Sequence, residues 1–142
     1  MQIQLFSVEE ASRLARELEP SLQELVRLKR EHDTVQSRID VLSLALSGAS
    51  PGNPDAQQLR RLLERRTRLG DRLRRGVEAI QSRGCVVKDL DQGLVDFYSI
   101  AGDRLIYLCW RLGEPEVAHW HPLEGGFASR QPRGLREEGD RR

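Results

Sequence analysis

The stretch from Gly84 to Gly126, GCVVKDLDQGLVDFYSIAGDRLIYLCWRLGEPEVAHWHPLEGG, decides the fold of this chain. Together with Phe127, which follows it directly, it holds six of the seven aromatic residues, both cysteines and two of the three histidines. Its apolar residues alternate with polar ones, which is the period of β-strands. The rest of the 142 residues is mostly leucine-spaced and arginine-rich, a pattern typical of long helices.

Turn signals divide this stretch into an antiparallel meander. Ala101-Gly102-Asp103 and Gly113-Glu114-Pro115 are both short, glycine-containing breaks between alternating segments. Because such breaks connect neighbouring antiparallel strands, the segments on either side of each one should pair. We therefore expect four strands, over Cys85–Lys88, Leu94–Ile100, Arg104–Leu112 and Glu116–His121.

The turn lengths also predict the register of the sheet and the composition of its two faces. A two-residue turn at Gly102-Asp103 places Asp96 opposite Cys109, and the second loop places Cys109 opposite His119. The apolar face, which we expect to form the core, carries Val95, Phe97, Ile106, Leu108, Trp110, Ala118 and Trp120. The opposite, polar face carries Asp96, Tyr98, Tyr107, Cys109, Arg111, His119 and His121.

The polar face brings together groups that can do chemistry. Cys109 with His119 or His121 and Asp96 could bind zinc or iron. Alternatively, Cys109 could be a nucleophile with a histidine as its base and Asp96 as the orienting group. The pattern favours a third interpretation, a polar sheet face in contact with water or a partner, because the spacing matches no recognised motif. We expect Cys109 and His121 to lie near a third donor, Asp96 or Glu114, without forming a closed four-ligand cage.

Two amphipathic helices precede the sheet and should form an antiparallel hairpin over residues 20–83. The loop at Ser47–Pro54 is short, so the helices on either side of it become neighbours. Their leucines follow the 3-4 spacing of a coiled-coil seam, in which His32 is a partly exposed member. Gly84 ends the second helix in the left-handed conformation. The predicted register places Leu28, Val35, Ile39 and Leu42 opposite Leu73, Arg66, Leu62 and Leu59, with Arg66 at the edge of the seam.

The N-terminus shows two further local signals. Met1–Phe6 alternates like a short strand. Ser7 and Glu10 form a capping box at the start of a helix. We expect a short first helix over Ser7–Glu19, with Pro20 either in the first turn of a second helix or at a kink, because Pro20 lacks an N–H group and clashes with the preceding turn.

The net charge of the chain is only +1, so the protein as a whole is not a polycation. Residues 55–83 carry nine bases and four acids, and the arginines over residues 60–75 could meet the phosphates of a nucleic acid. These arginines surround most of the helix, however, and no aromatic residue is interleaved with them for base stacking. The neighbouring residues 7–47 carry eight acids and six bases, so a solvated and partly neutralised helix is the better interpretation.

The chain length fits a single domain, which we place at residues 1–132, with a disordered tail over residues 133–142. Two cysteines and no signal-like apolar N-terminus predict a cytoplasmic protein with reduced thiols. No apolar run approaches the roughly 18 residues of a membrane span, so no membrane partner is expected.

Several runs resemble the bacterial domain-of-unknown-function family 2203, some members of which carry the automatic label "division initiation protein". The resemblance covers about residues 1–132. The runs that carry it are FSVEEA (6–11), KDLDQGLVDF (88–97), YLCWRLGEP (107–115) and WH (120–121). It implies a small bacterial cytoplasmic protein with a helical hairpin, and it implies no activity. Since His119 departs from the family pattern, the resemblance favours Cys109, Glu114 and His121 over His119 as site residues.

The sequence as a whole predicts an α+β fold: a long antiparallel helical hairpin with a short N-terminal helix and a small C-terminal antiparallel β-meander. The function it favours is that of a non-enzymatic interaction or scaffold protein without a cofactor, acting through its coiled-coil hairpin and its sheet. We expect a homodimer that buries more than about 1,000 Å². The alternatives are a metal-binding protein with zinc or iron near Cys109 and His121, and nucleic-acid binding through residues 60–75.

Overall fold

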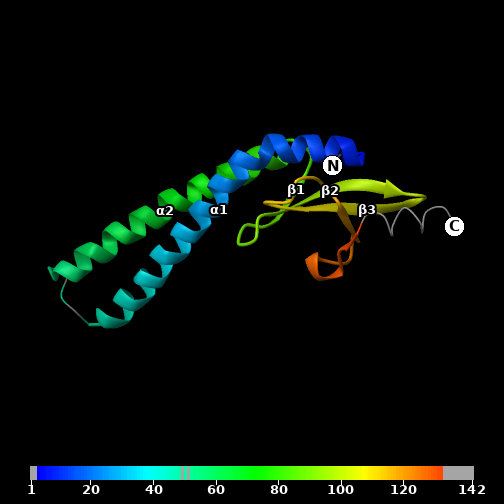
Figure 1. Cartoon of the computed structure of the whole chain (residues 1–142). Coiled ribbons are helices and arrows are strands. Elements are labelled where there is room, and N and C mark those ends of the chain that lie inside the picture. Colours follow the sequence, from blue (N-terminus) through cyan, green and yellow to red (C-terminus); the bar gives the residue numbers. More distant parts are fainter. Residues whose placement is uncertain (1–2, 49, 51, 133–142) are drawn as a thin grey trace.

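The computed structural model describes residues 3–48, 50 and 52–132 (Figure 1). It confirms the α+β architecture of a long antiparallel helical hairpin followed by an antiparallel sheet. The predicted tail over residues 133–142 lies outside the described part of the chain. The elements are α1 (Val8–Ala45), α2 (Pro54–Gln81), β1 (Val86–Asp89), β2 (Leu94–Ala101), β3 (Arg104–Arg111), β4 (His119–Pro122), the 3₁₀ helix η1 (Phe127–Ser129) and β5 (Gln131–Pro132).

The first helix begins as predicted but does not end where predicted. The Glu10 backbone N–H donates to Ser7 Oγ at 3.1 Å and the Ser7 N–H donates to Glu10 Oε1 at 2.9 Å, which confirms the capping box. The separate short helix is wrong, because α1 continues through Pro20 to its end. An interior proline costs about 3 kcal/mol, whereas burying Leu18 and Leu22 on either side of it contributes about 1.5–3 kcal/mol each. Figure 1 shows that α1 bends within its N-terminal half.

The predicted N-terminal strand is also wrong for the residues described, and Met1 and Gln2 lie outside them. Phe6 is the point of attachment: its N–H donates to the Tyr98 carbonyl at 2.8 Å and its ring meets Phe97 edge-on. Its carbonyl accepts from the Ser99 hydroxyl at 2.7 Å. Because a side chain supplies this second bond, residues 3–6 dock on the edge of β2 without a strand ladder.

The two helices pack in the predicted antiparallel register. Leu25 lies directly against Gly76, where an added Cβ would be 2.4 Å from Leu25 Cδ2. Leu25 precedes Leu28 by three residues and Gly76 follows Leu73 by three, so this contact belongs to the predicted Leu28–Leu73 register. The loop between the helices is confirmed, with Asn53 capping α2 and Pro54 in its first turn. Gly84 adopts a positive φ of 99° after α2, as predicted.

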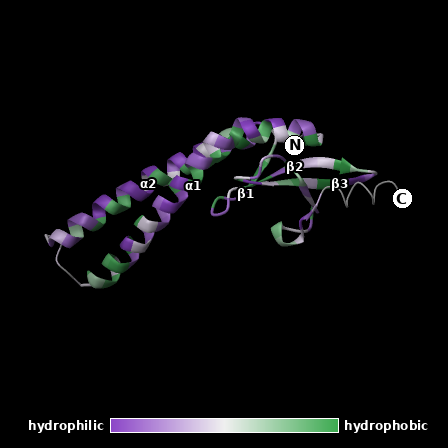
Figure 2. Ribbon diagram, in the orientation of Figure 1, coloured by the Kyte–Doolittle hydropathy of each residue, from purple (hydrophilic) through white to green (hydrophobic). Residues whose placement is uncertain are grey.

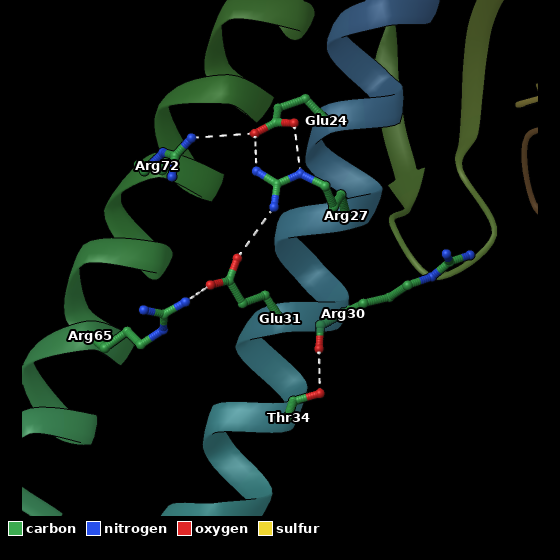
Figure 3. A network of polar contacts seen from close by, with 7 residues as sticks. All are labelled: Glu24, Arg27, Arg30, Glu31, Thr34, Arg65 and Arg72. Carbon is green, nitrogen blue, oxygen red and sulfur yellow. Dashed lines mark hydrogen bonds and ion pairs between the residues drawn. The ribbon is translucent and has the colours of Figure 1, made fainter. Parts of the chain in front are cut away.

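Ion pairs connect the helices along one side of the hairpin (Figure 3). Glu24 on α1 meets Arg72 on α2 at 3.3 Å, and Glu31 meets Arg65. Arg66 donates to the Gln36 side chain at 2.9 Å, at the edge of the seam. Exposed pairs of this kind contribute about 1 kcal/mol or less, so their main consequence is that α1 partly neutralises the arginine-rich helix.

The sheet has the order β1-β2-β3-β4-β5 and the predicted register. Asp96 lies opposite Cys109, and Cys109 lies opposite His119. Two differences concern the C-terminal side: β4 begins at His119 rather than Glu116, and β5 pairs with β4 although its two residues had no periodic signal.

The core lies between the apolar face of the sheet and the helices. Val95, Phe97, Leu108 and Trp110 are at most 1% exposed, as predicted for this face. The prediction that Ala118 lies in the core is wrong, because Ala118 is only partly buried. Its neighbour Val117 is fully buried instead. The reason is tertiary, because the Val117 N–H donates to Ser12 Oγ on α1 at 3.0 Å and turns Val117 inward.

The two faces of the sheet are covered by different parts of the chain (Figure 1). The N-terminal part of α1 runs along one face, and the hairpin extends well beyond the sheet. The segment after β4, drawn in orange, lies on the opposite side of the sheet from α1. Neither of the described helices has the length and apolar composition to cross a membrane.

Candidate metal centre

Three neighbouring strands each contribute one donor to the polar face of the sheet. Asp96 comes from β2, Cys109 from β3 and His121 from β4. Asp96 lies directly opposite Cys109, while His121 pairs with Tyr107 and is therefore diagonal to Cys109. All three side chains are buried, with residue exposures of 1–2%. The sheet register alone thus brings a carboxylate, a thiol and an imidazole together.

The donor atoms of these residues lie within 4.8 Å of one another. In a tetrahedral zinc site, ligand atoms about 2.0–2.3 Å from the metal lie roughly 3.3–3.8 Å apart. His121 Nε2 and Asp96 Oδ2 are 2.9 Å apart and share a hydrogen bond. The cluster therefore differs from a zinc geometry by about 1 Å, which side-chain rotation can supply.

A contact with the backbone fixes the orientation of the His121 imidazole. His121 Nδ1 lies 2.8 Å from the backbone carbonyl of Pro122. A carbonyl can only accept, so Nδ1 is the nitrogen that donates to Pro122, and Nε2 is the atom that faces the cluster and meets Asp96. Histidines that bind metals are commonly held this way, with the second ring nitrogen donating to a carbonyl or carboxylate.

One oxygen of Asp96 has no nitrogen or oxygen partner among the described residues. In this part of the chain, Oδ1 is buried without such a partner and Oδ2 faces His121, while the Cys109 thiol is the further neighbour that interacts with this carboxyl. Burial raises the pKa of the Asp96 carboxyl, and the nearby His121 opposes that rise. A buried polar atom without a partner is costly, and a cation between Asp96 and Cys109 would satisfy it.

The thiol of Cys109 is poorly suited to act as a nucleophile by itself. Burial, followed by the adjacent Asp96 carboxylate, raises the pKa of this thiol to about 12. In the described structure the ring nitrogens of His121 hydrogen-bond to Pro122 and Asp96 rather than to the thiol, and His119 Nδ1 meets Arg130. A bound metal ion would instead lower the pKa of the Cys109 thiol, because a thiol that coordinates a metal loses its proton.

The structure does not bring Glu114 into the cluster. Its carboxylate binds Arg130 Nη2 at 2.8 and 2.9 Å and accepts the Arg111 N–H at 2.7 Å. Arg130 also donates to His119 Nδ1 at 2.8 Å. Glu114 and His119 therefore belong to a separate polar group that holds the segment after β4 against the sheet.

Several residues that shape the site were not identified from the sequence. The Pro122 carbonyl is a backbone group and has no signature in the residue types. Arg130 lies in a charged stretch without pattern, although its side chain is only 12% exposed. Lys88 and the segment Gly125–Phe127 line a cavity of about 320 Å³ that reaches the three donors.

Residues 4–133 match the model of a protein family described as "Uncharacterized conserved protein (DUF2203)". None of the curated proteins and none of the solved structures matches the chain. The family match confirms the resemblance drawn from the sequence, and it spans both the hairpin and the sheet.

Proposed function

The chain belongs to the DUF2203 family, and we propose that it binds one divalent metal ion of the zinc type through Asp96, Cys109 and His121. The observation that carries the proposal is the buried Asp96 Oδ1, which has no nitrogen or oxygen partner among the described residues, beside the buried Cys109 thiol. The orientation of His121 by Pro122 supports it independently. The proposal concerns binding, and it assigns no reaction to the protein.

Zinc fits this set of donors better than the other common metals. Thiolate favours zinc, copper(I) and iron, and imidazole favours zinc, copper, iron and nickel, whereas magnesium and calcium prefer oxygen ligands alone. Zinc accepts sulfur, nitrogen and carboxylate oxygen in one site. A thiolate and a carboxylate would also balance the charge of a divalent ion, so the buried site would be neutral.

The test is a metal titration of the full-length protein, purified without an affinity tag. We expect the wild type to bind one equivalent of zinc in competition with a chromophoric chelator. Cys109→Ser and Asp96→Asn should each weaken binding by at least about ten-fold, because each removes one of three ligands. Cys85→Ser is the matched control, since Cys85 is the other buried cysteine and lies outside the cluster.

Two results would contradict the proposal. One is a wild-type protein that binds no zinc above the level of an Asp96→Asn, Cys109→Ser double variant. The other is a Cys109→Ser variant whose metal stoichiometry and affinity equal those of the wild type, as the scaffold interpretation of the sequence requires.

A second candidate function is self-association through the tip of the hairpin. Val41 and Leu44 on α1 are 65% and 81% exposed, and the end of α1 is coloured as hydrophobic in Figure 2. Exposed apolar side chains side by side on one helix favour contact with another apolar surface. We propose that a second copy of this chain covers this apolar tip, in line with the homodimer expected from the sequence.

The bacterial origin and the cytoplasmic location also stay predictions.

A further inference from the structure

The cavity beside the three donors is suited to a small ligand. Its volume of about 320 Å³ lies at the lower end of the roughly 300–1,000 Å³ of ligand pockets. Besides the donors, its walls come from the end of β1 with the following turn (Lys88–Gln92) and from the Gly125–Phe127 segment. A metal held by three protein ligands keeps one coordination position for a further ligand.

The ligand that suits this cavity depends on the charged groups around it. Metal, thiolate and carboxylate would balance one another, which leaves Lys88 and Asp89 as the charged side chains of the wall, and Asp89 Oδ1 accepts the Asp91 N–H at 2.7 Å. Lys88 is exposed, and its positive charge acts on the Asp96 carboxyl from a distance, where it opposes the rise of the Asp96 pKa. Lys88 is therefore the positively charged group of the cavity wall that a bound anion would meet.

An aromatic ring connects Lys88 to the proposed metal ligands. Lys88 Nζ lies 4.4 Å from the centre of the Tyr107 ring, and the same ring is 5.3 Å from the imidazole of His121. The contact with Tyr107 keeps the ammonium group on the polar face of the sheet. Lys88 thus lines the same cavity as the three donors.

We propose that this cavity binds a small oxyanion, a carboxylate or a phosphate group, between the open position of the metal and the ammonium of Lys88. The inference rests on the proposed metal site. An oxygen anion matches both partners, because it can coordinate a divalent metal and accept from an ammonium group. The small volume limits the ligand to a compact molecule, or to the anionic end of a larger one.

The test uses the full-length protein loaded with cobalt(II), whose visible absorption reports its coordination. Acetate and inorganic phosphate are titrated separately, so that the two arms distinguish a carboxylate from a phosphate ligand. We expect at least one of them to change the cobalt spectrum saturably. Lys88→Met should weaken the binding of that anion by about ten-fold, which is the effect of losing one hydrogen bond to a charged group. The same substitution should leave the affinity for cobalt within about two-fold of the wild type.

Lys29→Met is the matched control, because it makes the same change at the chain's other lysine, which pairs with Asp33 and Asp91. Cobalt binding without any spectral response to either anion overturns the inference and leaves the metal site standing. An anion that binds the wild type and Lys88→Met equally overturns the role of Lys88. A protein that binds no cobalt overturns the metal site and the inference together.

Discussion

At the scale of single residues, the two buried cysteines differ in what surrounds them. The thiol of Cys85 donates to the Ile80 carbonyl at 3.3 Å, at the junction of α2 and β1. Cys109 instead faces a carboxylate. Burial is the largest cause of the raised pKa in both, to about 11 for Cys85 and about 12 for Cys109, against an ordinary value of 9.0. Among the described residues, Cys109 has neighbours that could bind a metal with it and Cys85 has none.

The raised pKa of Cys85 predicts a loss of stability at alkaline pH. Between pH 9 and about 11 the unfolded chain releases the Cys85 proton while the native protein retains it, so the free energy of unfolding falls as pH rises. Over that range Cys85→Ala should lose less stability than the wild type, by on the order of 2 kcal/mol. Urea unfolding under reducing conditions at several pH values measures this difference. Parallel curves for the two proteins would contradict the prediction.

At the scale of elements, two glycines of α2 have opposite surroundings. An added Cβ at Gly76 would meet Leu25 Cδ2 at 2.4 Å, whereas at Gly70 it would meet nothing within 4 Å. Both residues are interior to the helix, where glycine is about 1 kcal/mol less favourable than alanine. The close approach of α1 and α2 at Gly76 therefore depends on the missing side chain.

We predict that Gly70→Ala stabilises the protein by about 1 kcal/mol through helix propensity alone. Gly76→Ala gains the same propensity but overpacks the hairpin, so it should be less stable than Gly70→Ala by about 1–3 kcal/mol. Chemical denaturation of both variants gives the comparison. If Gly76→Ala stabilises as much as Gly70→Ala, the tight contact with Leu25 is not a constraint on the hairpin.

A partly buried ion pair connects the segment after β4 to the sheet. Arg130 and Glu114 are 12% and 17% exposed, and Arg130 is also stacked on Phe127 at 4.7 Å. We predict that Glu114→Ala costs about 2–3 kcal/mol, because it leaves Arg130 and the Arg111 N–H without their acceptor.

A double-mutant cycle with Arg130→Ala separates the pair from its surroundings. The coupling energy should be about 1–3 kcal/mol if the two side chains stabilise the segment together. Additive effects of the two substitutions would show instead that each acts independently. The same cycle also tests whether the segment that lines the cavity is held by this pair.

At the scale of the whole molecule, the hairpin projects away from the sheet, and no other described element lies beside its tip (Figure 1). We predict that the protein sediments as a dimer at micromolar concentration. Val41→Glu with Leu44→Glu should produce monomers, because two charges would then enter the apolar contact. Ser43→Glu with Ser47→Glu adds the same charge at exposed positions and should remain dimeric. A monomeric wild type would contradict the prediction.

The sequence by itself determined the local features of this protein. The capping box at Ser7, the positive φ of Gly84 and the turn at Gly102-Asp103 depend on a few adjacent residues, so the residue types were enough to predict them. The register followed from the turn length, and it placed Asp96, Cys109 and His121 on one face of the sheet.

Only the tertiary structure decided how local preferences were overridden and how close the site residues came. Continuation of α1 through Pro20 required apolar burial on both sides of the proline to exceed its local cost. Val117, rather than Ala118, entered the core because Ser12, far away in sequence, supplied a hydrogen bond. Glu114 was drawn to Arg130, and His121 was turned toward Asp96 by the Pro122 carbonyl. These outcomes depend on burial and on partners distant in the chain, which neither periodicity nor spacing encodes.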